Sequence, residues 1–233
     1  MSSERVKYEV RDQVAIVRLD DGKANALSHE VIAALQAALD GAEREAAAVL
    51  LVGRDKRLCA GFDLAAMTAS PQSARRLVEG GAELMLRLYG FPLPVVVGCT
   101  GHALAAGAIL LLAADSRIGA EGDFKIGLNE VSIRLTLPVF AVELARDRLS
   151  KRHFTAAATQ ARIYDPSGAT DAGYLDRTAP AATLFDTAFE EARRLAAIPQ
   201  PAFRKTKNRE RGATIARIRE TLSTDLDDAF GRA

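Results

Sequence analysis

The most constraining feature of this chain is an apolar block at residues 94–115, which reads PVVVGCTGHALAAGAILLLAAD. Its β-branched run, Val95–Val97, predicts a buried strand. The Thr100–Ala103 segment predicts a turn of small residues, and Leu104–Ala114 predicts a helix buried on all sides. The first N–H groups of such a helix have no partner inside it, so a ligand oxygen could reach them across the small residues. The alternative is a central helix whose small residues serve only close packing.

A second small-residue turn follows the apolar run Ala48–Val52. Here Gly61 comes directly before Phe62. Glycine accepts backbone angles that other residues avoid, so Gly61 could turn the N–H of Phe62 toward a ligand. Two turns of this kind could aim two N–H groups at one oxygen atom, which is the arrangement of a backbone oxyanion hole.

Composition argues against several other classes of protein. The 31 Lys and Arg residues balance 30 Asp and Glu residues, so the net charge of +1 gives no global field that would attract nucleic acid or a membrane. Cys59 and Cys99 lie in apolar surroundings, which predicts no disulfide and fits a reducing compartment. The N-terminus is polar, and the longest apolar run, Ala103–Ala114, is too short to cross a bilayer. We therefore expect a soluble, cytoplasmic protein without a signal peptide.

Strand and helix patterns alternate along the rest of the chain. Strands are predicted at Val6–Val10, Val14–Leu19, Ala48–Val52, Arg117–Gly119 and Phe124–Ile126. Helices are predicted after Ser28, from Ser70 through Leu88, and at Pro138–Leu149, Lys151–Thr159 and Thr183–Ile198, with further helical segments up to Phe230. This alternation predicts an α/β architecture with parallel strand pairing.

Three blocks in this order resemble the crotonase (enoyl-CoA hydratase/isomerase) superfamily: CAGFDL at residues 59–64, GHALAAGAILLLAAD at 101–115 and FKIGLNE at 124–130. The resemblance covers most of the chain. It implies an α/β spiral of ββα repeats as a core over residues 1–182, followed by a C-terminal helical oligomerisation region over 183–233. It also implies a homotrimer or hexamer that acts on an acyl-CoA thioester, with coenzyme A as part of the substrate and no separate cofactor.

The same resemblance assigns candidate site residues. The backbone N–H groups of Phe62 and Ala106 would form the oxyanion hole, and Glu130 would be the catalytic residue. Candidate contacts to coenzyme A are Ala24, Ala26, Ala60, Asp63, Leu64 and Lys207. Candidate acyl-pocket residues are Ile109, Leu135 and Phe140. Position 106 is usually glycine in the family; alanine keeps the N–H and adds a methyl group.

An oxyanion hole suits a thioester because removal of an α-proton places negative charge on the carbonyl oxygen. Burial over an apolar pocket raises the pKa of a glutamate, and Glu130 in such a position would suit a general base near neutral pH. The alternative is that Glu130 lies at the surface or caps a loop. Hydratases of the family carry a second glutamate at the position of Ile109, and isoleucine can neither hold water nor exchange a proton. The best interpretation is a Δ3–Δ2-enoyl-CoA isomerase. Enoyl-CoA hydration and a non-catalytic acyl-CoA binding or assembly role stay open.

The basic run RKTKNRER at residues 204–211 has two interpretations. It is either a solvated helix face or a contact to coenzyme A phosphate, for which Lys207 matches the family's lysine. Binding of RNA is disfavoured because no aromatic residue interleaves the run. The three histidines and two cysteines show no metal-ligand spacing, so we expect no metal.

Overall fold

The computed structural model describes residues 5–231, and its centre is a six-stranded sheet in the order β1–β2–β3–β5–β7–β9. The strands are β1 (Val6–Arg11), β2 (Val14–Leu19), β3 (Ala48–Val52), β5 (Val95–Cys99), β7 (Ser116–Ala120) and β9 (Arg177–Ala179). β1 and β2 form an antiparallel hairpin, and the pairs that follow are parallel. β3 and β5 are buried along their whole length, because helices cover parallel strands on both faces.

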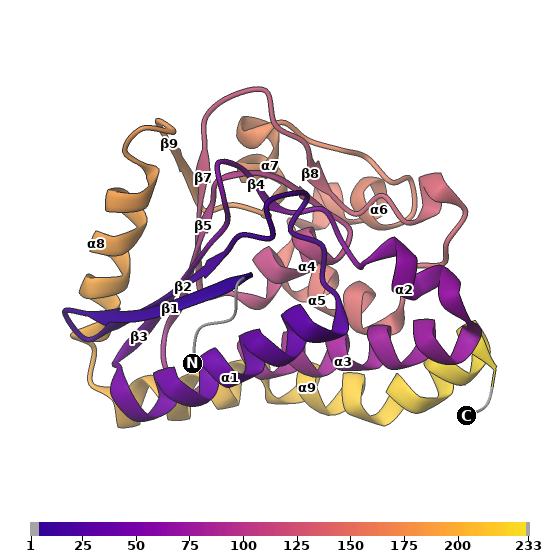
Figure 1. Ribbon diagram of the computed structural model, residues 1–233, viewed down its shortest axis with the longest axis horizontal. Coiled ribbons are helices and arrows are strands. Elements are labelled where there is room, and N and C mark those ends of the chain that lie inside the picture. The colour runs from indigo at the N-terminus through magenta and orange to yellow at the C-terminus, as the bar shows by residue number, and fades with distance from the viewer. Residues whose placement is uncertain (1–4, 232–233) are drawn as a thin grey trace.

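A smaller parallel sheet contains β4 (Lys56–Cys59), β6 (Gly101–Leu104) and β8 (Ile126–Gly127). Each of its strands follows a strand of the large sheet, so β3–β4, β5–β6 and β7–β8 are successive turns of a spiral (Figure 1). The predicted α/β architecture is thereby confirmed. The predicted turn at residues 100–103 is wrong, because most of it forms β6, which pairs with β4 and β8. Helix α4 (Ala106–Ala113) begins two residues later than predicted, and the strand predicted at Phe124–Ile126 is reduced to β8.

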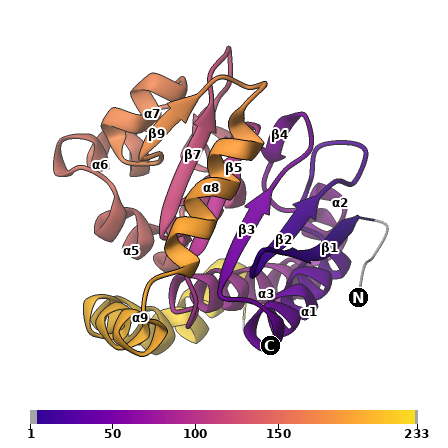
Figure 2. The same ribbon diagram turned by 90° about the vertical axis from the view of Figure 1, so that its left-hand side faces the viewer.

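Helices cover both faces of the large sheet. α1 (His29–Glu45) and α3 (Pro71–Tyr89) lie on one face, and α8 (Leu184–Ala196) covers the other (Figure 2). The side chains of β3 alternate between these layers: Val49 and Leu51 join the larger core, and Leu50 and Val52 join the core beneath α8. The remaining helices are α2 (Leu64–Ala69), the 3-10 turn η1 (Val131–Ile133), α5 (Val139–Arg148), α6 (Lys151–Ala158), α7 (Pro166–Ala172) and α9 (Gln200–Phe230). α4 packs against α3, α5 and the small sheet.

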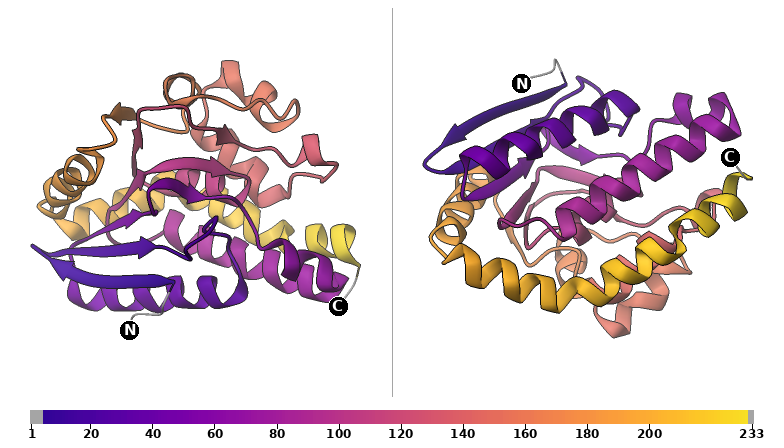
Figure 3. Two further views of the ribbon diagram at one scale, coloured as in Figure 1. Left: turned by 45° about the horizontal axis from the view of Figure 1, so that its top comes forward. Right: turned by 90° about the horizontal axis from the view of Figure 1, so that it is seen from below.

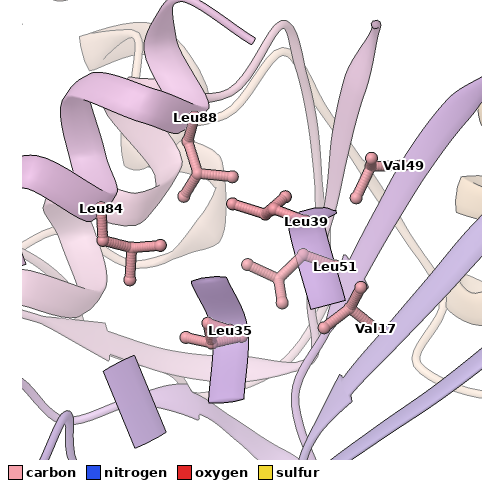
Figure 4. Close-up of a pocket in the computed structure, with 7 residues that line it drawn as sticks. All are labelled: Val17, Leu35, Leu39, Val49, Leu51, Leu84 and Leu88. Atoms are coloured by element: carbon pink, nitrogen blue, oxygen red, sulfur yellow. The ribbon is translucent and has the colours of Figure 1, made fainter. Parts of the chain in front are cut away.

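The larger core is packed closely between the sheet and two helices. Figure 4 shows side chains of β2 and β3 facing leucines of α1 and α3 around a cavity of about 10 Å³. The lining residues are Val17, Leu35, Leu39, Val49, Leu51, Leu84 and Leu88. A space this small, with only aliphatic walls, offers no polar partner to a ligand, so it belongs to the core and not to a binding site.

The two C-terminal helices pack on the rest of the molecule. α8 packs across the strands of the large sheet, and α9 runs beside α3 and α5 along the underside (Figure 3). The division at residue 183 and the oligomerisation role of this region stay predictions. No helix in the described part of the chain is both long and apolar enough to span a membrane.

Candidate active site

The first turn of the site follows β4. Gly61 adopts φ +113°, a conformation that glycine alone adopts freely, and it reverses the chain after Cys59. Leu27 pairs with Phe62 in an isolated parallel bridge, through hydrogen bonds from Leu27 N to Gly61 O at 2.9 Å and from Asp63 N to Leu27 O at 3.0 Å. The N–H of Phe62 therefore points away from Leu27. Among the described residues it has no hydrogen-bond acceptor.

The second turn leads from β6 into α4. Ala105 takes φ +50° and ψ −122°, which is strained for a residue with a Cβ, and its N–H is held by Gly127 O at 3.1 Å. Ala106 is the first helical residue, so its N–H is one of the unpaired donors of a helix start. α4 has no side-chain cap, and no described residue accepts a hydrogen bond from this N–H.

The two turns lie against each other. A Cβ built on Gly61 would lie 3.8 Å from Ala106 N. A Cβ built on Gly107 would lie 2.1 Å from the carbonyl oxygen of Cys59, which is less than any real contact. Only the absence of a side chain at Gly107 allows this approach, so the turn before Phe62 and the start of α4 at Ala106 pack directly against each other.

Glu130 follows β8 and stands at the start of η1. It is only 8% exposed, and its Oε2 makes no hydrogen bond with any described residue. Burial raises the pKa of this carboxyl from 4.5 to about 7, and the backbone N–H groups of Glu130 and Asn129 offset part of that rise. A carboxyl group with this pKa exchanges protons readily near neutral pH.

One cavity of about 410 Å³ connects the first turn with the glutamate. Five of the predicted site residues line it: Phe62, Ile109, Glu130, Leu135 and Phe140. The other lining residues are Met67, Val78, Arg134, Thr136, Pro138, Asp225, Asp228, Ala229 and Phe230. The cavity therefore joins Phe62 of the first turn and a buried carboxyl to a largely apolar space, and Ala106 is not among its lining residues.

Sequence reasoning missed the part that α9 plays in this cavity. Asp225, Asp228 and Phe230 come from its last two turns and lie far along the chain from the other lining residues. Helical spacing shows which face of a helix packs, but not which element that face meets. Val78 lies on α3, whose amphipathic spacing could have found it, whereas Met67 lies on α2, a six-residue helix without a buried face.

Most candidate contacts to coenzyme A gather beside the first turn. Ala60 N donates to Ala24 O at 3.1 Å, which brings the segment with Ala24 and Ala26 next to the turn. The Asp63 side chain caps α2 through a hydrogen bond of 2.8 Å. Leu64 is 74% exposed at the start of that helix. These five residues lie on or near one surface, and their contacts to coenzyme A stay predictions.

Lys207 does not belong to this surface. Its side chain is 3% exposed, and its Nζ lies 2.6 Å from Asp115 Oδ2, while Arg211 approaches the other carboxylate oxygen at 2.9 Å. Burial lowers the pKa of Lys207 to about 8, although the charge of Asp115 opposes that change. The structure thus holds the ammonium group of Lys207 in an ion pair inside the protein, away from this surface, and its contact with coenzyme A stays a prediction.

The raised pKa of Glu130 makes the stability of the protein depend on pH. Below 4.5 the carboxyl is protonated in both states; between 4.5 and about 7 the unfolded chain releases the proton and the folded chain keeps it. The free energy of unfolding therefore falls as pH rises through this range, by about 3 kcal/mol in all. Glutamine does not ionise, so Glu130→Gln lacks this loss. The free energy of unfolding of the variant, minus that of the wild type, is therefore expected to be about 3 kcal/mol larger above pH 7 than below pH 4.5. Urea unfolding of both proteins below pH 4.5 and above pH 7 measures this. A difference between variant and wild type that is the same at the two pH values would contradict it.

Comparison with known proteins places this arrangement in a family. Residues 9–227 match the family model for enoyl-CoA hydratase/isomerase. A structure of an enoyl-CoA hydratase/isomerase family protein from Pseudomonas syringae is 41% identical, with a TM-score of 0.95 over 97% of this chain and 98% of that one. The Mycobacterium tuberculosis enoyl-CoA isomerase is 36% identical, with a TM-score of 0.91 over 95% and 97%. A putative enoyl-CoA hydratase from Thermus thermophilus is 32% identical over 200 residues, which are 80% of this chain and 74% of that protein.

The relatives carry both the isomerase and the hydratase name, so the comparison fixes the family and not the specific activity. The spiral fold and the match over residues 9–227 both indicate the same family. This chain belongs to the enoyl-CoA hydratase/isomerase (crotonase) family of enzymes.

Proposed function

We propose that the protein is a Δ3–Δ2-enoyl-CoA isomerase with Glu130 as its single proton carrier. Glu130 takes a proton from C2 of a 3-enoyl thioester, and the electrons of that C–H bond move toward the carbonyl to give a dienolate. The N–H groups of Phe62 and Ala106 donate to the thioester oxygen, where the charge develops. Glu130 then delivers the proton to C4, so the double bond lies between C2 and C3 and the thioester carbonyl is restored.

The observation that carries this proposal is the buried Glu130 carboxyl, whose Oε2 has no described partner, on the same cavity as Phe62. A pKa of about 7 lets the group act first as a base and then as an acid. Ile109 lines the cavity where hydratases of the family carry a second glutamate, and it offers no group to hold an attacking water. Of the other carboxyl groups on the wall, Asp225 caps α5, and Asp228 is exposed on α9.

Coenzyme A enters this proposal only as part of the substrate. The surface beside the first turn, with Ala24, Ala26, Ala60, Asp63 and Leu64, is our candidate for its binding. The homotrimeric or hexameric assembly and the cytoplasmic location stay predictions.

Turnover of two substrates tests the proposal. Purified protein is expected to convert 3-enoyl-CoA into 2-enoyl-CoA, followed by the absorbance of the conjugated thioester, faster than it hydrates 2-enoyl-CoA. Because the base must be ionised, kcat/KM for isomerisation is expected to rise with pH and level off above about 7. Faster hydration than isomerisation would favour a hydratase, and binding of acyl-CoA without turnover would favour a non-catalytic role.

A further inference from the structure

The end of α9 forms one wall of the catalytic cavity. Ala229 and Phe230, in its last turn, line the same cavity as Glu130. Phe230 is partly buried and packs against the larger core. Figures 1 and 3 show this end of α9 beside the start of α3 and close to α2. The last helix therefore supplies part of the wall of the cavity that contains Glu130.

An ion pair holds this turn against α3. Arg75 Nη1 lies 2.8 Å from Asp227 Oδ1, and the same nitrogen donates to Gly231 O at 3.4 Å. The Arg75 side chain is 11% exposed, so solvent screens this pair less than a surface pair. Its positive charge also lies at the C-terminus of α9, where the helix dipole favours a cation.

A hydrogen bond holds the same region against α5. Asp225 Oδ2 accepts from Val139 N at 2.8 Å. Val139 is the first residue of α5, and the N-cap residue Pro138 supplies no side-chain acceptor. Asp225 therefore caps α5 from a neighbouring helix. Because Pro138 and Phe140 line the cavity as well, this bond joins two of its walls.

We propose that the last turn of α9 is the end wall of the acyl site, and that Phe230 sets the longest acyl chain that the site accepts. The Arg75–Asp227 ion pair keeps this wall in place. The inference rests on the proposed function, because it places an acyl chain in the cavity. Since Ala229 and Phe230 are apolar, the substrate class is a CoA thioester with a hydrocarbon tail of limited length.

Phe230→Ala tests the wall directly. An apolar pocket discriminates between chains that differ by one methylene group by roughly 10- to 200-fold, so the variant is expected to raise kcat/KM for longer 3-enoyl-CoAs, relative to short ones, by about 10-fold or more. For saturated acyl-CoAs of the same lengths, the dissociation constants of the longer chains are expected to fall relative to those of the short ones. Phe203→Ala is the matched control, because Phe203 is a partly buried phenylalanine near the start of α9 that does not line the cavity. It is expected to keep the wild-type chain-length profile.

Arg75→Gln tests the ion pair. It is expected to shift the chain-length profile in the same direction by a smaller factor, and to increase hydrogen exchange at residues 225–230. If Phe230→Ala does not fold, Phe230→Leu replaces it as the test of the wall. Binding constants that keep the wild-type chain-length profile in the folded Phe230 variant would overturn the inference. If the wild type turns over no 3-enoyl-CoA, but the Phe230 variant binds longer acyl-CoAs more tightly than the wild type does, the isomerase proposal fails and the end wall stands.

Discussion

Glutamine in place of Glu130 is expected to lower kcat for isomerisation of 3-enoyl-CoA by roughly 10²- to 10⁴-fold, the usual contribution of a positioned general acid–base group. Glutamine keeps the size of the side chain but cannot take up the C2 proton. The proposed oxyanion donors and the candidate coenzyme A surface are unchanged, so KM is expected to change little. Steady-state kinetics measure both constants, and exchange of the C2 protons with deuterated solvent, followed by NMR, reports the first proton transfer.

Glu121→Gln is the matched control for this variant. Glu121 is an exposed glutamate in the loop after β7 and does not line the cavity, so its replacement is expected to leave kcat unchanged. A Glu130→Gln protein that isomerises 3-enoyl-CoA at the wild-type rate would refute the role of Glu130. The proton carrier would then have to be sought among the other carboxyl groups on the cavity wall, Asp225 and Asp228.

The parts of the site that lie close together in the sequence could be predicted from it. Gly61 and Phe62 follow a strand directly, and the strand-to-helix order around Ala106 is visible in the apolar block. Small residues at such turns have a local physical reason, because they free backbone N–H groups and allow close approach. The three sequence blocks then indicated the family, which the comparison confirms, and the resemblance made Glu130 the candidate catalytic residue.

The parts that depend on partners distant in the sequence could not be predicted in this way. Residues 101–104 look like a turn because they are small, but pairing with β4 and β8 makes them a strand, and no local pattern reports that pairing. Lys207 lies in a basic run that suggests a solvated face, yet Asp115 draws it into the interior. Phe230 reaches the cavity only because α9 runs the full length of α3 and α5, which the helical pattern of α9 alone does not show.

Gly107→Ala is expected to reduce kcat on the order of 10²- to 10³-fold, the effect of losing one oxyanion donor. The added Cβ would lie 2.1 Å from Cys59 O and 2.8 Å from Cys59 C, and these backbone atoms cannot rotate away as a side chain does. The first turn of α4, with the N–H of Ala106, must therefore move away from the turn that carries the N–H of Phe62. Overpacking of this kind also lowers the free energy of unfolding by about 1–3 kcal/mol, so thermal unfolding is measured beside kcat.

The control for Gly107→Ala is the same substitution where space exists. In Gly80→Ala, on α3, the nearest atom to the new Cβ is Ile32 Cγ2 at 3.8 Å, so kcat is expected to stay unchanged and the helix to gain up to about 1 kcal/mol. If Gly107→Ala is folded and only its KM rises, the contact between the turns positions the substrate and does not stabilise charge. If it is folded with the wild-type kcat, the N–H groups of Phe62 and Ala106 are not what stabilises the enolate. A loss in kcat that leaves KM unchanged is the result that the two-amide site requires, because those amides act most strongly on the charge that develops in the transition state.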